Sequence, residues 1–598
     1  MALGNHPLRA AYFSMEIALR ADIPTYAGGL GILAGDTLRS AADAGLPIAG
    51  VTLLDRKGYF EQHLDEHGNQ TETPSLWKPE AILEATNARA SIVIEGRTVV
   101  LRAWQYSIHG LGGYSVPVYL LDAALPENSP FDQSLTDELY GGDDHYRLCQ
   151  EAVLGIGGME ILNALGCKHV LTFHMNEGHA SLLILALLQA HLAGRTEELT
   201  SQDLDFLRKK CVFTTHTPVP AGQDQFPKDL VRRVLGDDRV TLLKKLGGFT
   251  ENTLNMTFLG LRASHYINGV AMQHAEVSRS MFPSYPIHAI TNGVHATTWT
   301  SAPFQELYDR HIPEWRRDNL YLRYAIGIPL PEIRDAHAGA KKALIKEVNL
   351  VTGVRLSENA MTLGFARRAA TYKRADFLFS NTERLKWIAQ HVGPFQIIFS
   401  GKAHPHDEPG KALIRRVYEM IAQLKGIISI AYIENYDIRW AQLITSGVDL
   451  WLNTPHRPYE ASGTSGMKAA LNGVPSLSVP DGWWREGHVE GATGWDVGHE
   501  EIPDDPAEEI ASLYHKLEDI ILPMFYGRKD AYADVMRLSI ALNGSFFNTQ
   551  RMVAQYVMNA YFSGKQGSSV QQIIEDARRS EPIRNATNLQ QNQDPAAE

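Results

Sequence analysis

Short apolar runs, each followed by a longer amphipathic stretch, recur through the second half of the chain and constrain its fold most strongly. They lie at 361–365, 396–400, 428–433, 448–452 and 475–479. Their spacing of roughly 20 to 35 residues is typical of buried parallel strands joined by crossover helices. We therefore expect a doubly wound, Rossmann-like α/β domain over 356–565.

The first half of the chain opens with a similar pattern. An apolar run at 11–19, a glycine-rich turn and an amphipathic stretch lead to a second apolar run at 47–54, which is the order of a βαβ unit. Three more apolar runs follow, at 169–173, 211–215 and 288–291. The fold class that we expect is α/β, with two doubly wound Rossmann-like domains facing each other across a cleft.

These patterns divide the chain into four parts. We expect a first domain over 1–300, connecting segments over 301–355, a second domain over 356–565 and a largely disordered tail over 566–598. The tail is rich in Gln, Asn and Ser, so it has little apolar surface to bury. A chain of 598 residues is too long for one hydrophobic core, which agrees with at least two domains.

Polar and cationic residues follow nearly every expected strand. "ARRAATYKR" follows the run at 361–365, "GKAHP" the run at 396–400, and "NTPHRPYEASGTSGMK" the run at 448–452. In the first half, "HMNEGH" and "HTPVPAG" occupy equivalent positions. Ligands of open parallel sheets bind beyond the carboxyl ends of the strands, so these loops predict one shared site between the domains.

Composition and charge exclude several classes of function. Lys and Arg number 56 and Asp and Glu 68, giving a net charge of −12, whereas a nucleic-acid binder needs a basic surface. The sequence has no apolar run long enough to span a bilayer and no signal-peptide core at its start. Cys149, Cys167 and Cys211 form neither a disulfide framework nor a zinc pattern. We expect a cytoplasmic protein without nucleic-acid or membrane partners.

The segment "ARRAATYKR" places Arg367, Arg368, Lys373 and Arg374 within eight residues. A lone cluster of this kind is most simply a solvated helix face, but its position directly after a buried strand favours anion binding. Arg offers a planar fork for phosphate oxygens, and Lys offers a mobile charge. Lys402 adds a cation at the next strand end.

Three loops of the first half complete the expected site. In "YAGGLG", Gly28 and Gly29 let backbone N–H groups approach an anion, although the segment fits no standard phosphate-loop pattern. "HMNEGH" resembles a metal motif only loosely, so we expect no metal there and favour hydrogen bonding to a sugar or to the site wall. His216 stands at a strand end before two prolines, whose fixed turn favours a role in the cleft.

The stretch "EASGTSGMK" runs from Glu460 to Lys468. Its small residues Ser462, Gly463 and Thr464 offer N–H and O–H donors to an anion. Burial and nearby cations would lower the pKa of the lysine, which favours a Schiff base with a carbonyl compound. The alternative is a solvated lysine on the first turns of a helix.

Together these motifs resemble those of the glycogen, starch and maltodextrin phosphorylases. "EASGTSGMKAALNG" is similar to the segment of that family that binds pyridoxal phosphate. "YAGGLG", "NEGH", "HTPVP", "NGVA", "TNGVH", "RRAATYKR", "SGKAHP" and "ENYDIRW" also have counterparts there, in the same order, across residues 11–500. The resemblance is strongest to the short bacterial and archaeal α-glucan phosphorylases.

The resemblance implies pyridoxal 5′-phosphate as cofactor, with its phosphate group rather than its ring taking part in catalysis. It implies phosphorolysis of terminal α-1,4-glucosyl bonds to α-glucose 1-phosphate with retained configuration, on a two-domain glycosyltransferase fold of the GT-B type. The residues that it implies for cofactor binding are Lys468, Arg367, Tyr436, Gly463, Thr464 and Gly29.

The resemblance also implies roles at the substrate. The catalytic residues are Lys468, Arg368, Lys373, His216 and Glu460, and the substrate-binding residues are Gly28, Gly29, Glu177, His179, His216, Asn292, Glu460 and Ser462. The substrates that the resemblance implies are an α-1,4-glucan and inorganic phosphate, and the family favours homodimers. No metal is implied.

Departures from the animal enzymes concern regulation. Ala370 and Thr371 replace a His-Glu pair inside the basic segment, and Glu177 is one methylene longer than the aspartate of the larger enzymes. The chain begins almost at the catalytic core, so we expect the phosphorylation and nucleotide-effector sites of the animal enzymes to be absent.

The main alternative is a nucleotide-sugar-dependent glucan synthase-like glycosyltransferase of the same fold. Many retaining transferases of that fold carry two glutamates eight positions apart, and the second meets the donor ribose. Here Glu460 is followed at the second position by Lys468, which favours a phosphorylase. A non-catalytic glucan-binding relative is a further, less favoured alternative.

Overall fold

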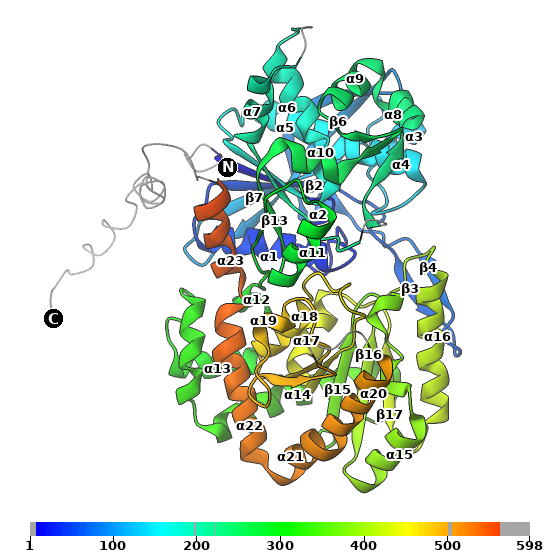
Figure 1. Cartoon of the computed structure of the whole chain (residues 1–598), viewed down its shortest axis with the longest axis vertical. Coiled ribbons are helices and arrows are strands. Elements are labelled where there is room, and N and C mark those ends of the chain that lie inside the picture. The colour runs from blue at the N-terminus through cyan, green and yellow to red at the C-terminus, as the bar shows by residue number, and fades with distance from the viewer. Residues whose placement is uncertain (1–7, 196–198, 220–221, 500–504, 562–598) are drawn as a thin grey trace, which may run out of the picture.

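The computed structural model describes residues 8–195, 199–219, 222–499 and 505–561 of the chain. These residues build two lobes, one above the other in Figure 1, and each contains a mainly parallel sheet covered by helices. The expected α/β class with two wound sheets is confirmed. The predicted tail, 566–598, lies outside the described residues.

The first lobe is built on a nine-stranded sheet with the order β14-β13-β9-β8-β1-β2-β7-β6-β5. Alternate residues of β1 join different hydrophobic clusters, Ala11 and Phe13 on one face and Ala10 and Tyr12 on the other, so both faces are covered. The strands are β1 (Ala10–Phe13), β2 (Ile48–Leu53), β5 (Glu84–Ile94), β6 (Arg97–His109), β7 (Ser115–Asp122), β8 (Thr172–Asn176), β9 (Cys211–Thr214), β13 (Ser264–Gly269) and β14 (Ile287–Ala289).

One edge of this sheet departs from the doubly wound expectation. β7 and β6 pair antiparallel, as do β6 and β5, whereas every other neighbouring pair in the sheet is parallel. Glu95 and Gly96 join β5 to β6 with positive φ values of 50° and 74°, as a tight hairpin requires. The apolar-run pattern did not identify these strands, because β5 is half exposed and alternates buried with exposed residues.

β8 also differs from its predicted position. It spans Thr172–Asn176 rather than 169–173, and it is buried along its whole length. Its polar residues are tolerated in the core because they are hydrogen-bonded: His174 bonds to Thr214 and Tyr561. A strand with buried polar residues at its end carries those residues into the site.

The second lobe contains a six-stranded sheet with the order β17-β16-β15-β18-β19-β20, in which every pair is parallel. All five strands predicted for the second half are present, and only β20 was not identified. The bounds are β15 (Met361–Ala366), β16 (Phe395–Ser400), β17 (Ser429–Ile433), β18 (Leu450–Asn453), β19 (Ser476–Ser478) and β20 (Gly494–Asp496). The crossover helices include α15 (Thr382–His391), α16 (Glu408–Gln423), α17 (Ile438–Gly447) and α18 (Ser465–Ala470).

The segments between the two sheets are helical. α13 (Ala302–His311), the 3₁₀ helix η4 (Asn319–Gly327) and α14 (Leu330–Thr352) occupy the stretch predicted as connecting segments. α14 begins after Pro329 and ends at Gly353, whose φ of 69° suits a helix end that only glycine adopts easily. Its buried face packs on α17, so this stretch belongs physically to the second lobe.

The C-terminal helices return to the first lobe. α23 (Thr549–Tyr556) and the π-helical turn η9 (Val557–Tyr561) pack into a hydrophobic cluster of the first sheet. Ser40 and Thr549 are hydrogen-bonded at 2.6 Å, and Tyr561 reaches His174. These residues lie within 356–565, the expected second domain, but their contacts tie them to the first one. The pattern of apolar runs carries no sign of this return.

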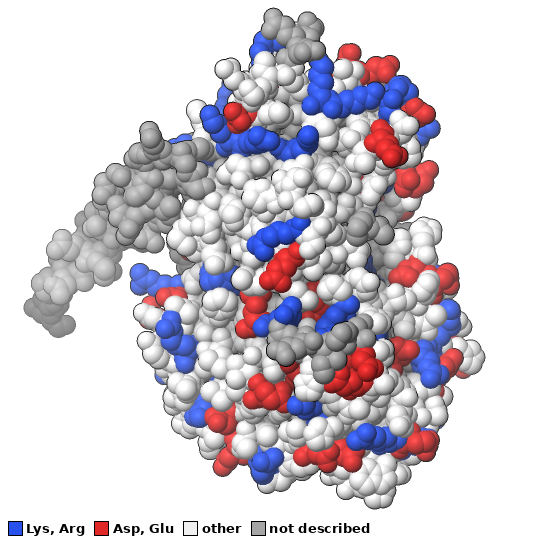
Figure 2. Space-filling model, in the orientation of Figure 1, with Lys and Arg blue, Asp and Glu red and all other residues white. Residues whose placement is uncertain are grey.

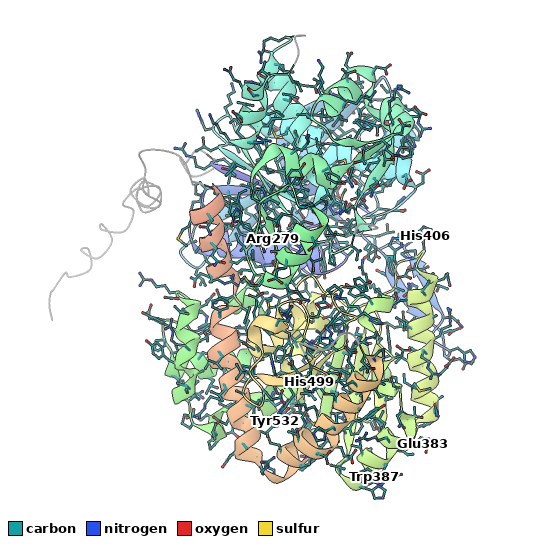
Figure 3. All side chains as sticks on the ribbon, in the orientation of Figure 1. Arg279, Glu383, Trp387, His406, His499 and Tyr532 are labelled. Carbon is teal, nitrogen blue, oxygen red and sulfur yellow. The ribbon has the colours of Figure 1, made fainter. Side chains whose placement is uncertain are left out.

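The hairpin of β3 (Glu61–Leu64) and β4 (Gln70–Thr73) crosses from the first lobe to the second, beside α16 in Figure 1. The Gln62 amide donates to Asn435 at 2.6 Å, and Lys411 pairs with Glu72 at 2.8 Å. Figure 3 places His406 at the same junction. The lobes are therefore joined both by the chain and by a direct polar contact.

Surface charge is mixed. On the face shown in Figure 2, acidic and basic side chains are interspersed, as the balance of 56 cations and 68 anions suggests. Within the described ranges, no helix combines the length and apolar character needed to cross a bilayer.

Candidate active site

The carboxyl ends of both sheets meet between the lobes. Between the lobes the Ile438 amide donates to the Tyr26 hydroxyl at 3.0 Å, and Lys402 Nζ donates to the Phe60 carbonyl at 2.7 Å. Burial lowers the pKa of Lys402 to about 8. Lys402 was predicted to bind an anion, but in this structure its amine joins the two lobes.

Lys468 lies on α18 and is buried, with 6% of its surface exposed. Its Nζ stands 3.8 Å from the ring centroid of Trp299, and within the described part of the chain no carboxylate lies in ion-pair range of it. Burial lowers the pKa of Lys468 from 10.5 to about 8, although Asp36 opposes the shift. Near neutral pH a useful fraction of this amine is therefore neutral and nucleophilic. The alternative of a solvated lysine is wrong.

Trp299 is held in place from two sides. Its indole N–H donates to Asp36 Oδ2 at 2.6 Å, and Asp36 also accepts from the His295 amide at 3.1 Å. The Asn472 side-chain amide donates to the carbonyls of Trp299 and Lys468, at 2.8 and 3.0 Å. The motifs did not single out Asp36, Trp299 or Asn472. Only Asn472 carried a signal, since it lies inside the stretch around Lys468.

Glu460 joins the loop before α18 to the basic segment after β15. Its carboxylate accepts from Lys373 Nζ at 2.5 Å and from Arg367 at 3.3 Å. Burial alone would raise the pKa of Glu460, but Lys373 and Arg367 outweigh it and hold the pKa below its ordinary value. Arg367 also donates to Ser465 Oγ at 3.2 Å, so it lies beside the helix that carries Lys468.

The four cations of the basic segment do not all face the same site. Arg374 turns into the core, where it donates to the Thr454 and Pro455 carbonyls and pairs with Glu509 at 2.7 Å. Arg374 is therefore structural, because a buried guanidinium must be paired and hydrogen-bonded. Its place in the predicted anion cluster is wrong.

Arg368 is the exposed cation of this segment, and no ion pair engages it among the residues that the structure describes. Desolvation by the facing lobe acts to lower the pKa of Arg368, but the surrounding groups Tyr372, Tyr59 and Glu16 raise it above the ordinary value. Tyr59 and Glu16 belong to the first lobe, so Arg368 faces across the cleft. An unpaired guanidinium in this position is free to bind an anion.

Unpaired polar atoms surround the loop before Lys468. Ser462 Oγ and Arg367 Nε are buried and have no hydrogen-bond partner among the described residues. Gly463 adopts a φ of 82°, and the Thr464 side chain makes no cap hydrogen bond to α18. Burial raises the pKa of Tyr436, while Arg367 lowers it, so this ring lies close to the same guanidinium. Buried donors without protein partners are available to bind an anionic ligand.

Glu177 holds in place the part of the site that the first lobe contributes, here called the first-lobe wall. It has a φ of 77°, and its carboxylate accepts from the His216 amide at 2.6 Å and from Thr217 Oγ1 at 3.0 Å. Burial raises the pKa of Glu177 to about 7 despite these hydrogen bonds. The carboxylate thus fixes the backbone at His216, and His216 Nε2 lies 2.7 Å from Asn176 Oδ1.

His179 and Asn292 present unpaired atoms beside this wall. His179 Nε2 lies 3.4 Å from Asp224, while its Nδ1 is buried without a partner among the described residues. Burial lowers the pKa of His179 to about 4, so the ring is neutral near pH 7. Asn292 Oδ1 is likewise buried and unpaired in the described chain, and the Asn292 carbonyl accepts from Arg551. Neutral donors and acceptors of this kind suit sugar hydroxyls better than a metal.

The glycine loop is held by a residue that the motifs missed. Glu16 Oε2 accepts from the Ala27 and Gly28 amides at 2.6 and 3.1 Å, and Glu16 Oε1 accepts from the Tyr140 hydroxyl at 2.9 Å. The Gly28 amide, expected to bind substrate phosphate, is therefore already used. Gly29 begins α1 (Gly29–Asp43) and faces open space, so it is the glycine left for a ligand.

Metal ligation finds no support in the side chains. Among the described residues, no group of three or more His, Cys, Asp or Glu is arranged to hold an ion. The fold and site together define a two-lobed α/β enzyme with a buried lysine and, among the described residues, an unpaired guanidinium at a strand end.

Comparison with known proteins gives the family. Residues 237–486 match the family model for carbohydrate phosphorylase. Maltodextrin phosphorylase of Thermococcus litoralis is 39% identical, over 92% of this chain and 70% of its own. Glycogen phosphorylase of Mycobacterium tuberculosis is 36% identical, over 96% of this chain and 74% of its own, and that of Aquifex aeolicus is 32% identical, over 92% and 85%. The chain belongs to the carbohydrate phosphorylase family.

Proposed function

We propose that this chain is an α-1,4-glucan phosphorylase. It cleaves a terminal α-1,4-glucosyl bond with inorganic phosphate and releases α-glucose 1-phosphate with retained configuration. The observation that carries the proposal is a buried, unpaired Lys468 beside the unpaired donors of Arg367 and Ser462, in a family whose relatives include maltodextrin and glycogen phosphorylases.

The residues present fit pyridoxal phosphate. Lys468 would hold its aldehyde carbon, and the phosphate group would lie among Arg367, Gly463, Thr464 and Gly29, with Tyr436 beside the ring. When bound, the cofactor would supply a phosphate group able to donate and accept a proton. The orphaned Arg367 Nε and Ser462 Oγ support this fit, since an anion would satisfy them.

The chain's own residues bind and orient the substrates. Arg368 binds inorganic phosphate as the unpaired cation of the site. Lys373 is oriented toward the phosphate by its ion pair with Glu460. The phosphate gives a proton to the glycosidic oxygen, the C1–O bond breaks, and a phosphate oxygen then bonds to C1. These cations offset the repulsion between neighbouring phosphates.

The first-lobe wall holds the glucosyl unit. Glu177 fixes the backbone at His216. The His216 carbonyl stabilises the positive charge that develops on the sugar ring. His179, Asn292, Glu460 and Ser462 offer the remaining polar contacts for the sugar. Because His179 and His216 are neutral, they hydrogen-bond the substrate without repelling the developing charge.

Further parts of the proposal concern the setting of the enzyme. We propose a cytoplasmic homodimer that takes α-1,4-glucan and phosphate as its partners. The mixed surface charge in Figure 2 suits neutral glucan better than a nucleic acid. The synthase-like alternative is not favoured, because Lys468 replaces the acidic group that would meet a ribose.

Formation of glucose 1-phosphate tests the proposed function. The protein is incubated with maltodextrin, with and without inorganic phosphate, and glucose 1-phosphate is measured. We expect product only with phosphate, and none from Lys468→Ala. Product without phosphate, or no product from any α-glucan, would contradict the proposal.

A further inference from the structure

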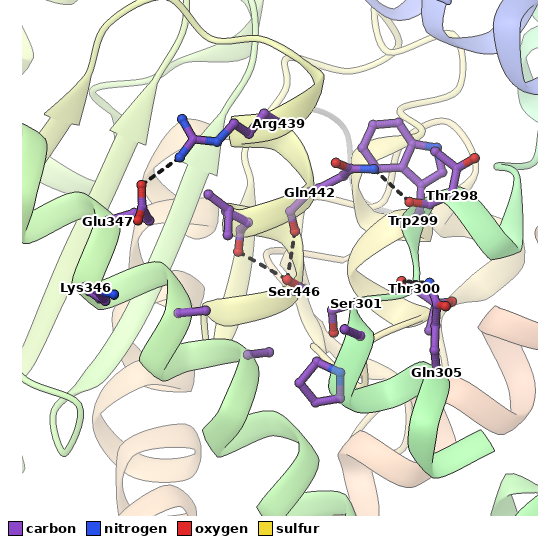
Figure 4. Close-up of a pocket in the computed structure, with 15 residues that line it drawn as sticks. Thr298, Trp299, Thr300, Ser301, Gln305, Lys346, Glu347, Arg439, Gln442 and Ser446 are labelled. Carbon is purple, nitrogen blue, oxygen red and sulfur yellow. Dashed lines mark hydrogen bonds and ion pairs between the residues drawn. The ribbon is translucent and has the colours of Figure 1, made fainter. Parts of the chain in front are cut away.

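A pocket of about 580 Å³ lies on the second lobe outside the proposed active site (Figure 4). It is bounded by residues 298–305, by the middle of α14 and by the outer face of α17. None of the proposed catalytic or substrate-binding residues lines it. Its size lies within the range of small-molecule sites, about 300–1,000 Å³.

The pocket wall is lined by hydroxyl and amide groups around a small apolar patch. Thr298, Ser301, Gln305 and Gln442 supply polar atoms, and Pro303, Ala340 and Ala343 supply apolar surface. Ser301 Oγ is buried and has no hydrogen-bond partner among the described residues. A wall of this kind suits a ring that carries both hydroxyls and C–H faces, as a sugar does.

Charges gather at the side of the pocket formed by α14 and α17. Arg439 pairs with Glu347 at 2.7 Å, as the dashed line in Figure 4 marks. Lys346 is exposed beside them and forms no ion pair among the residues that the structure describes. One cation is thus left uncompensated, which favours a ligand with one anionic group.

The pocket and Lys468 share a wall. Trp299 lines the pocket and also lies under Lys468 Nζ, at 3.8 Å from ring centroid to nitrogen. Asn472 accepts from the Ser301 amide at 2.7 Å and donates to the carbonyls of Trp299 and Lys468. A ligand that moves the 299–301 segment therefore acts on Lys468 through two direct contacts.

We propose that this pocket binds a small polyhydroxylated anion, a sugar phosphate or a sugar acid, and that its occupancy alters the surroundings of Lys468. The ring hydroxyls bond to Ser301 and Gln442, and the anionic group meets Lys346. The site lies beyond the proposed active site, and its ligand binding is measured without turnover.

Calorimetric titration of the full chain tests the site with glucose 6-phosphate, gluconate and neutral glucose. We expect one or both anions to bind, and glucose to bind at least about fivefold more weakly, because it lacks the contact with Lys346. Ala343→Trp, at an exposed lining position of α14, fills the pocket and should abolish this binding. Lys346→Ala should weaken it about fivefold, whereas Lys342→Ala, on the same helix outside the pocket, should leave it unchanged.

Each outcome decides the proposal. Binding that persists in Ala343→Trp belongs to the region between the lobes and overturns the proposal, as does the absence of binding by both anions.

The link to Lys468 is tested by trace acetylation of the cofactor-free protein, read by mass spectrometry with Lys402 as the internal control. A bound anion should change the labelling of Lys468 and not of Lys402. An unchanged Lys468 would overturn the link, and neither measurement depends on phosphorylase activity.

Discussion

At the scale of single residues, the partner of each buried lysine separates structure from function. Lys341 and Lys411 are buried but paired with Asp449 and Glu72. Lys468 is as buried as these, and among the described residues its amine contacts an aromatic ring and no carboxylate. Burying a charge without a carboxylate partner is costly, so folding alone gives no reason to keep this lysine. Its environment suits a group that must be neutral in order to react.

The low pKa of Lys468 predicts how the cofactor-free protein takes up pyridoxal phosphate. Only the neutral amine attacks the aldehyde, and the folded pKa is about 8 against an ordinary 10.5. The uptake rate should therefore rise with pH up to about 8 and then level off. Stopped-flow absorbance between pH 6 and 10 measures it. A rate that keeps rising to pH 10 would show an ordinary, solvated lysine.

The second residue-scale prediction concerns Arg368. Arg368→Ala removes the unpaired guanidinium of the cleft and should lower kcat/KM for phosphate by about 10- to 150-fold, the loss of one charge-assisted hydrogen bond of about 1.5–3 kcal/mol. Arg368→Lys keeps the charge and should recover part of it. Steady-state kinetics measure both, with the exposed Lys425→Ala as control. Equal activity of Arg368→Ala and wild type would rule out the proposed phosphate contact.

Sequence patterns located most of these residues because chemistry-bearing side chains follow directly after apolar runs. Lys468, Glu460 and Arg368 could be identified in this way. The sequence did not show that Arg374 is structural whereas its neighbours line the site, since its buried partner Glu509 lies far along the chain. The role of Glu16 was not predicted either, because no sequence spacing identifies a carboxylate that accepts hydrogen bonds from backbone amides.

At the scale of elements, the glycine loop and α1 depend on close packing around Glu16. A Cβ at Gly31 would meet Glu16 Oε2 and Tyr26 Cβ at 2.7 Å, whereas a Cβ at Gly29 would meet no atom within 4 Å. Two glycines of the same segment, separated by one residue, therefore have different reasons to be glycine. Gly31 makes room for the residue that shapes the loop, and Gly29 leaves space for a ligand.

This difference predicts that substitution at Gly31, but not at Gly29, lowers stability. Gly31→Ala should lower the free energy of unfolding by about 1–3 kcal/mol, because Glu16 or the loop must shift. Gly29→Ala serves as the matched control and should leave stability unchanged in the absence of substrate. Chemical denaturation of both variants measures this. A Gly31→Ala variant as stable as the control would show that Glu16 does not depend on this space.

Patterning predicted the buried elements better than the exposed ones. β15 to β19 overlap the predicted apolar runs and were identified within two residues of their observed bounds. β5 and β6 were not identified, because a strand with one face exposed lacks a continuous apolar run. The β3–β4 hairpin is polar as well, since its partner is the other lobe rather than a core.

At the scale of the whole molecule, the C-terminal helix α23 completes a site formed by distant segments. Arg551 of α23 donates to the carbonyls of Thr291 and Asn292, at 2.6 and 2.9 Å. Asn292 is one of the proposed sugar-binding residues, so the last described helix fixes part of the substrate wall. Sequence order gave no sign of this contact, which spans roughly 260 residues.

Arg551→Ala should therefore act on substrate binding from a distance. Losing the two carbonyl contacts should raise KM for the glucan by about tenfold, the equivalent of about 1.4 kcal/mol, while leaving the affinity for phosphate largely unchanged. Initial rates at varied glucan and phosphate concentrations measure the two effects separately. The exposed Lys529→Ala is the control. A rise in both constants would indicate general loss of structure instead.

The most direct test of the account is the position at which the cofactor is attached. The purified protein, loaded with pyridoxal phosphate, is reduced with borohydride, digested and mapped by mass spectrometry. Lys468 and Lys402 both have a pKa near 8, but Lys402 Nζ is engaged by the Phe60 carbonyl whereas Lys468 faces Trp299. We predict a single pyridoxyl group, on Lys468. No adduct, or an adduct on Lys402, would contradict the account.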